Sequence, residues 1–229
     1  MQAYVLHSRK YTDSRLIVDF LTTDSGRISA VTRTNKKQSS LLQPFKSLDI
    51  EWKGRGELKT VIQCEPDSSQ SYSLSGGMLY CGLYLNELLQ RLLPVDEENL
   101  AVFESYQYAV RQLAKLRNTS EVEPILRIFE FSVLKCLGFA VQFTETSPEG
   151  KPVQVAENYF FISGQGLVIA HDEARMPGAL QVSGEALLAI DSEDYASVET
   201  RKVAKAIARR SLAPLLGNRP LKSRELFQG

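Results

Sequence analysis

The sequence is poor in the residue types that metal and redox sites are built from. It holds 3 cysteines, 2 histidines and 1 tryptophan among 229 residues. Cys64, Cys81 and Cys136 lie far apart without a C-x-x-C pair, so we expect buried thiols and neither a disulfide framework nor a zinc ribbon. His7 and His171 fall in separate predicted domains with no ligand spacing around them. No metal or other cofactor is therefore predicted.

Catalytic motifs are also missing. The chain has no G-x-x-x-x-G-K-[ST] loop, no G-x-G-x-x-G and no H-E-x-x-H. The segment 163–166, SGQG, resembles a nucleophile elbow but joins two predicted strands, whereas the elbow leads from a strand into a helix. The acidic groups at 96–98 and 191–194 lie at expected helix ends, where carboxylates favour the helix dipole. These absences predict a protein that is not an enzyme.

Long apolar runs are absent as well. No stretch approaches the roughly 18 apolar residues that a membrane-spanning helix needs. The first 16 residues lack the apolar centre of a signal peptide. We therefore expect a soluble, cytoplasmic protein without a membrane partner.

The net charge of zero conceals an uneven distribution. Residues 1–75 carry 11 Lys and Arg against 8 Asp and Glu, residues 76–200 carry 8 against 18, and residues 201–229 carry 8 against 1. The net charges of these segments are +3, −10 and +7. Two basic ends can form one positive face for a polyanion, although ordinary solvated surfaces are the alternative.

The first 65 residues show the pattern of a small β-barrel. Strands are expected at 3–6, 16–21, 27–33, 48–53 and 58–64, with turns at 24–26 and 54–56 and a loop at 34–40. Five short strands in this length favour an OB-fold, the commonest oligonucleotide-binding barrel of that size. The strand count alone leaves an SH3-like barrel open.

From residue 76 the apolar period becomes that of helices. Helices are expected at 77–93, 98–117, from a capping box at 120–123 to Gly138, at 184–190 and at 198–213, where Pro214 should end the regular pattern. A hairpin is expected at 159–162 and 167–169. The predicted fold class is α+β and multidomain: an OB-fold barrel over 1–75, then an α-helical domain over 76–229 with a β-rich insertion at about 143–178.

Basic and aromatic residues remain as candidates for function. Cations neutralise phosphates and aromatic rings stack on bases, as in sequence-tolerant DNA binding. The barrel contributes Phe45 and Trp52, although Trp52 alternates with Leu48 and Ile50 and can equally be a core residue. The candidate DNA-binding cations are Arg27, Arg33, Lys36, Lys37, Arg55 and Lys59 in the barrel and Arg201, Lys202, Lys205, Arg209 and Arg210 on the last helix.

Six segments together resemble the RecO family, most closely its proteobacterial form. They are YVLHSRKYTDS at 4–14, LLQPF at 41–45, GRGELKT at 54–60, LYCGLYLNELLQRLL at 79–93, LRIFEFSVLKCLGF at 126–139 and RPLKSRELF at 219–227. The resemblance implies an N-terminal OB-fold and a DNA repair and recombination mediator of the RecF pathway. Such a protein binds single- and double-stranded DNA, anneals complementary strands and, with RecR and single-strand-binding protein, promotes RecA loading at the nucleoid.

The same resemblance implies a partner site on the helical domain. In relatives the acidic tail of single-strand-binding protein docks beside an arginine of an LR-x-FE motif, which is 126–130 here. A carboxylate-ended aromatic tail needs an apolar groove with a guanidinium at its rim. We expect Arg127 at that rim and Phe131 and Leu113 in the groove, between the second and third helices; a plain surface cation is the alternative for Arg127. The four-cysteine zinc module of many relatives has no counterpart.

Two other function classes remain open. An OB-fold adaptor for structured RNA would share the basic barrel but prefer A-form shape and 2′-hydroxyl contacts. A nuclease would have to assemble its carboxylates from residues that are scattered along the sequence. Competition between RNA and single-stranded DNA, and recovery of intact DNA after incubation with magnesium, separate these classes from a recombination mediator.

Overall fold

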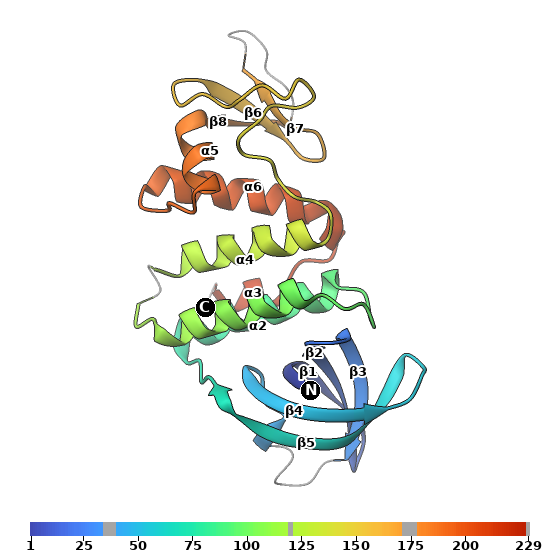
Figure 1. Ribbon diagram of the computed structural model, residues 1–229. Coiled ribbons are helices and arrows are strands. Elements are labelled where there is room, and N and C mark those ends of the chain that lie inside the picture. The colour runs from blue at the N-terminus through green and yellow to red at the C-terminus, as the bar shows by residue number, and fades with distance from the viewer. Residues whose placement is uncertain (34–39, 119–120, 171–177, 228–229) are drawn as a thin grey trace. The chain divides into compact units, whose positions relative to one another are not determined.

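The computed structural model describes residues 1–33, 40–118, 121–170 and 178–227 (Figure 1). The chain forms two compact units, Met1–Val122 with Arg219–Gly229, and Glu123–Asn218. The expected boundary at residue 75 thus falls inside the first unit, because two helices pack against the barrel there. Residues 34–39 of the expected loop and Ser120 of the expected capping box lie outside the described residues.

The first unit contains a closed five-stranded barrel. Its strands are β1 (Gln2–Thr12), β2 (Arg15–Thr22), β3 (Gly26–Arg33), β4 (Lys46–Lys53) and β5 (Leu58–Ser71). They pair in the order β1-β2-β3-β5-β4, and β1 closes on β4. Alternate residues such as Val18, Phe20, Ile28 and Ala30 fill the interior, as a period of two requires. The barrel is OB-like, as the sequence predicts, but β1 and β5 are much longer than expected.

Two helices, α2 (Gly76–Leu92) and α3 (Leu100–Lys115), pack against this barrel (Figure 1). The ring of Tyr4 lies 5.5 Å from that of Phe103 and 5.2 Å from that of Tyr106. The buried Asn86 accepts a 2.7 Å hydrogen bond from the Tyr106 hydroxyl and donates to the Leu6 carbonyl at 2.9 Å. Barrel and helices therefore share apolar and polar contacts that bind them into one unit.

A short 3₁₀ helix, η2 (Lys222–Phe227), completes the first unit by returning to α2. The carboxylate of Glu87 accepts hydrogen bonds from the backbone N–H groups of Lys222 and Ser223 at 2.9 and 2.8 Å, and from the Ser223 hydroxyl at 2.6 Å. One carboxylate thus satisfies two N–H groups at the start of η2, which have no partner within the helix. Leu221 is buried beside it.

The turn between β2 and β3 requires glycine. Gly26 has a φ of +61°, and a Cβ placed on it would lie 1.8 Å from the Glu97 carbonyl oxygen. The adjacent backbone is fixed there too, since the Asp96 N–H donates to the Arg27 carbonyl at 2.8 Å. Only glycine combines this conformation with so close an approach of two backbones.

The second unit contains helices and a small sheet. The elements are α4 (Val122–Cys136), β6 (Asn158–Ile162), β7 (Gly166–Ile169), β8 (Leu180–Ser183), α5 (Gly184–Asp191) and α6 (Val198–Leu216). The β6–β7 hairpin confirms the predicted one, and β8 adds an unpredicted third strand in the order β7-β6-β8. Phe161, Leu167, Leu187 and Ile207 belong to its core.

The expectation that Pro214 ends the last helix is wrong, because α6 continues to Leu216. Proline lacks the N–H that would bond to the Arg210 carbonyl, and its ring crowds that carbonyl. That carbonyl instead accepts a 3.0 Å hydrogen bond from the Ser163 hydroxyl, and the Gly217 N–H closes the last turn on Ala213. Within the described residues no helix is both long and apolar enough to cross a membrane.

Candidate nucleic-acid interface

Two of the predicted barrel cations are exposed. Arg33 ends β3, and Arg55 lies in the turn between β4 and β5. The parallel pairing of β3 with β5 sets Ser29 opposite Leu58 and Val31 opposite Thr60, so Arg55 precedes this ladder and Arg33 follows it. At about 3.3 Å per residue, β3 runs roughly 13 Å from Ser29, opposite Leu58, to Arg33, and Arg55 lies in the turn before Leu58. Only an extended polyanion can contact both at once.

Two other predicted barrel cations have structural partners. Lys59 is only 7% exposed, and its ammonium donates at 2.8 Å to both the Asp96 carboxylate and the Gly56 carbonyl. The guanidinium of Arg27 donates to the Leu93 carbonyl at 2.9 Å. The expectation of free phosphate-binding cations does not match these contacts, because β5 places Lys59 on its inner side and β3 places Arg27 against the end of α2. Lys36 and Lys37 lie outside the described residues.

The predicted barrel aromatics belong to the core. Phe45 is buried. Trp52 is half-buried and packs against the barrel interior, in line with its alternation with Leu48 and Ile50. Neither ring is open for stacking on a base, so the core alternative for Trp52 is the one that the structure supports.

The five cations of α6 divide in the same way. Arg201 donates to the Tyr195 and Ala196 carbonyls at 2.6 and 2.7 Å. Lys205 forms a 2.6 Å ion pair with Glu123 on α4, and the half-buried Arg210 points back to the Ala206 carbonyl at 3.4 Å. Lys202 and Arg209 are exposed and seven residues apart, and hence on one helix face. Two of the five are therefore open to a phosphate backbone.

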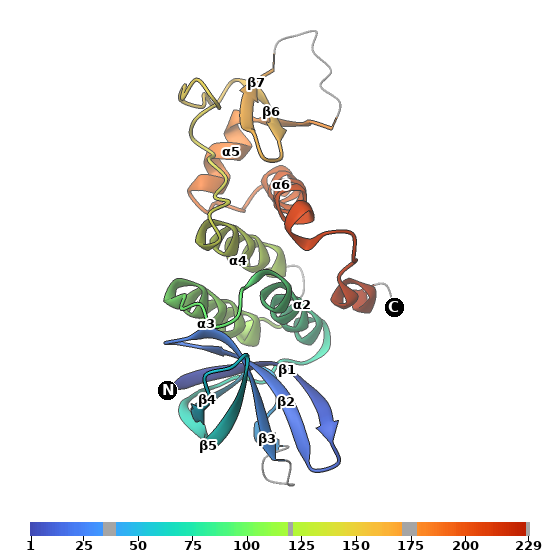
Figure 2. The same cartoon turned by 90° about the vertical axis from the view of Figure 1, so that its right-hand side faces the viewer.

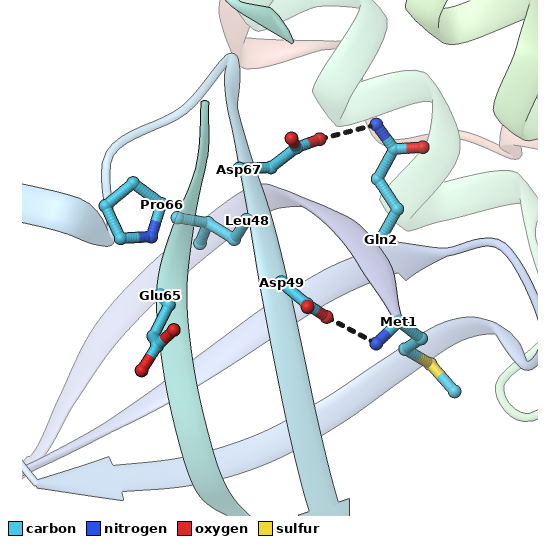
Figure 3. A pocket seen from close by; sticks show the side chains of 7 residues that line it. All are labelled: Met1, Gln2, Leu48, Asp49, Glu65, Pro66 and Asp67. Carbon is cyan, nitrogen blue, oxygen red and sulfur yellow. Dashed lines mark hydrogen bonds and ion pairs between the residues drawn. The ribbon is translucent and has the colours of Figure 1, made fainter. Parts of the chain in front are cut away.

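A pocket of about 400 Å³ on the barrel carries the opposite charge (Figure 3). Its lining includes the carboxylates of Asp49, Glu65 and Asp67. Asp49 pairs with the Met1 ammonium at 2.5 Å, and Asp67 accepts a 2.8 Å hydrogen bond from the Gln2 amide (Figure 3). Three carboxylates repel a phosphate backbone, so this side of the barrel is unsuited to DNA.

A basic region that sequence reasoning missed lies at the hairpin between β1 and β2. Every residue from His7 to Arg15 is exposed, including Arg9, Lys10 and Tyr11. The sequence pattern predicts no strand in this segment, which lies between the strands expected at 3–6 and 16–21. Its signal was the mixture of cations and an aromatic in HSRKYTDSR, which lacks the apolar alternation of the barrel strands.

Comparison with known proteins places these features in a family. The model "Recombination protein O N terminal" matches residues 1–70, and "Recombination protein O C terminal" matches residues 74–225. The chain belongs to the RecO family. "DNA repair protein RecO" of Cellvibrio japonicus is 42% identical to this chain over 231 residues, covering 98% of this chain and 94% of that protein. Those of Marinobacter nauticus and Haemophilus influenzae are 42% and 36% identical, with at least 92% of each chain covered.

The partner site that the RecO resemblance implies has a different geometry from the one expected. Arg127 is only 5% exposed, and its Nη2 donates to the Glu130 carboxylate at 2.6 Å one helical turn away. Phe131 packs against the core of the second unit, 5.1 Å from the ring of Phe143. Leu113 is buried in the first unit. Arg127 is thus not at an open rim, and the groove for a partner tail stays a prediction.

Of the three thiols of this RecO-family chain, Cys81 is buried as expected, whereas Cys64 and Cys136 are partly exposed. Burial raises the pKa of Cys81 to about 11 and also raises the pKa values of Cys64 and Cys136. A thiol with a raised pKa holds little thiolate at neutral pH and is a poor nucleophile or metal ligand. Across the described residues, no three His, Cys, Asp or Glu side chains are grouped so that they could hold a metal ion.

Proposed function

We propose that this RecO-family protein is a non-enzymatic recombination mediator that binds single- and double-stranded DNA and anneals complementary strands. With RecR and single-strand-binding protein it promotes the loading of RecA. The observation that carries the proposal is the match of the RecO family models to nearly the whole chain. The OB-like barrel agrees with it, because its exposed cations are spread along an extended path.

The spacing of the cations supports contact with a backbone, without readout of bases. Arg33 and Arg55 lie at the two ends of the β3–β5 ladder, and Lys53 is exposed beside the same turn as Arg55. Cations that contact phosphates position a protein on DNA but carry no sequence information. An annealing protein requires such sequence-independent contacts, because it must hold any sequence while leaving base edges free to pair.

Salt titration of DNA binding tests the proposal. Fluorescence anisotropy is measured with a labelled single strand and a duplex of the same length at several salt concentrations. Arg55→Gln should weaken binding of all sequences and flatten the slope of log affinity against log salt by about 0.7 on the single strand. The matched control is Arg27→Gln, which removes a cation that is engaged with Leu93 and should leave the slope unchanged. Equal slopes for wild type and Arg55→Gln would remove Arg55 from the interface.

We further propose that the helical second unit contributes the site for the tail of single-strand-binding protein. The guanidinium of Arg127 can donate to a carboxylate, although in this structure it pairs with Glu130, so tail binding requires the guanidinium to become accessible. Calorimetry with the acidic tail peptide tests this step. Arg127→Lys should weaken peptide binding but leave single-stranded DNA binding unchanged, whereas equal losses in both would place the site elsewhere.

The same anisotropy assay also tests RNA binding, with unlabelled RNA as a competitor. A single-stranded RNA competitor that displaces DNA at much lower concentration than unlabelled DNA would favour the RNA adaptor class. We expect DNA and RNA strands to compete about equally, because phosphate contacts do not depend on the 2′-hydroxyl.

A further inference from the structure

The hairpin that joins β1 to β2 extends beyond the barrel (Figure 2). Strand β1 starts in the barrel wall, and β2 ends in it. The first part of β1, Ala3 to Leu6, is buried, whereas His7 to Arg15 is exposed throughout. A strand with exposure on both faces contributes little to a core. Nine residues of ordered hairpin without a core role call for another reason for their presence.

The base of this hairpin is clamped to α2. The register of β1 on β2 shifts between Val5 and His7, so Leu6 is a bulge residue. Its carbonyl accepts hydrogen bonds from the Asn86 amide at 2.9 Å and the Gln90 amide at 3.1 Å. Bulges bend a strand and redirect its side chains. Because the bend is bonded to a helix, the outer hairpin is presented in a fixed direction from the barrel.

Two arginines face each other across the strands at this end of the barrel. The register places Arg15 on β2 directly opposite Arg33 on β3, and both are exposed. Like charges at directly opposed positions destabilise a sheet. Among the described residues no carboxylate pairs with Arg9, Arg15 or Arg33, whereas Lys10 pairs with Asp13 at 2.7 Å. A phosphate between Arg15 and Arg33 would relieve their repulsion.

An aromatic side chain lies next to these cations. Tyr11 is 54% exposed, and a second shift of register between Lys10 and Thr12 leaves it without an opposing residue on β2. Such a position frees its ring from the ladder. Exposed aromatic rings beside cations stack on the bases of single strands, and duplexes offer no free base face.

We propose that this outer hairpin, residues 7–15 together with Arg33, is a DNA-strand contact in which Arg15 and Arg33 hold one phosphate and Tyr11 stacks on a neighbouring base. The proposal rests on the DNA binding proposed above and deepens it, because it joins the predicted Arg33 to a hairpin that the predicted cation set leaves out. Arg9 extends the contact along the hairpin toward the next phosphate. The element reads no sequence, since both contacts accept any nucleotide.

Anisotropy with the full-length protein tests the hairpin, using a labelled oligothymidine and a duplex of equal length. The double variant Arg15→Gln with Arg33→Gln should lose about tenfold in affinity for both probes. Its slope of log affinity against log salt should fall by about 0.7 on the single strand, because the two arginines hold one phosphate between them. Tyr11→Ala should lose about 5- to 100-fold on the single strand alone with an unchanged slope, and Tyr11→Phe should bind as wild type does.

Arg111→Gln is the matched control, because it removes an exposed arginine from α3 in the same unit. Far-UV circular dichroism confirms that each variant is folded. If wild type binds both probes but the double variant keeps its affinity and slope, the hairpin is not a contact and the proposed function stands. If Tyr11→Ala loses equally on duplex, stacking is refuted. If wild type binds neither probe at low salt, the proposed function and the hairpin contact both fail.

Discussion

The buried ion pair of Arg127 and Glu130 supports a prediction about the stability of the second unit. Both side chains are almost fully buried on α4, and a single 2.6 Å hydrogen bond joins them. The Nε and Nη1 atoms of Arg127 have no hydrogen-bond partner among the described residues. Removing one partner breaks the ion pair inside the core, which typically costs about 3–5 kcal/mol.

Replacing Arg127 with methionine should therefore lower the free energy of unfolding by about 3–5 kcal/mol, a large part of the usual stability of a domain. Glu130→Gln should cost a similar amount. The double variant should cost less than the two single losses together, by at least about 1 kcal/mol, because the ion pair can be lost only once. The remaining loss reflects the cavity and the poorer packing that the substitutions leave.

Urea titration followed by far-UV circular dichroism measures these changes. Lys135→Met is the control, since Lys135 is exposed on the same helix and its loss should change stability by no more than about 0.5 kcal/mol. The reasoning is refuted if Arg127→Met unfolds at the wild-type urea concentration, or if the losses of the two single variants add without coupling. Either result would mean that water reaches the pair in solution.

Three further predictions concern other parts of the chain. Gly26→Ala should destabilise the first unit by more than about 3 kcal/mol in thermal or urea unfolding, because its Cβ would lie 1.8 Å from the Glu97 carbonyl oxygen at a φ of +61°; wild-type stability would contradict this close approach. Burial raises the pKa of Glu87, but its hydrogen bonds to Ser223 and Lys222 outweigh burial and lower the pKa below the usual 4.5. The stability that Glu87 contributes should therefore be present above pH 4.5 and lost as the pH falls through the lowered pKa. Glu87→Gln should flatten this acid dependence of η2 docking, followed by urea unfolding at several pH values, and an unchanged pH profile would exclude the carboxylate. Elemental analysis should find no stoichiometric zinc in the purified protein, and one tightly held zinc per chain would show ligands that the sequence did not reveal.

The barrel and most helices could be predicted because their patterns are local. Alternation of apolar residues marked the strands, and a helical period with turn residues marked α2, α3 and α6. The outer part of the β1–β2 hairpin could not be found in this way, because strands that are exposed on both faces have no apolar alternation. Strand β8 was missed for a related reason: its four residues are too few to show a period.

The site was predicted less well than the fold because charge in a sequence does not show what the charge is paired with. In the sequence Lys59 and Arg27 are two cations like any others. In the fold Lys59 pairs with Asp96, and Arg27 donates to the Leu93 carbonyl. Arg127 was expected at the rim of an apolar groove, but it is buried in an ion pair with Glu130, one turn along the same helix. Burial and partners decide which cations are free, and both follow only from the three-dimensional structure.

Annealing of complementary strands that are coated with single-strand-binding protein tests the central claim most directly. The reaction is run with two labelled complementary oligonucleotides in buffer that contains EDTA and no nucleotide, and duplex formation is followed by energy transfer. The wild-type protein should accelerate annealing well above the rate of the coated strands alone, and the Arg15→Gln, Arg33→Gln variant should be slower. Annealing no faster than in the absence of the protein would contradict the assignment of a recombination mediator.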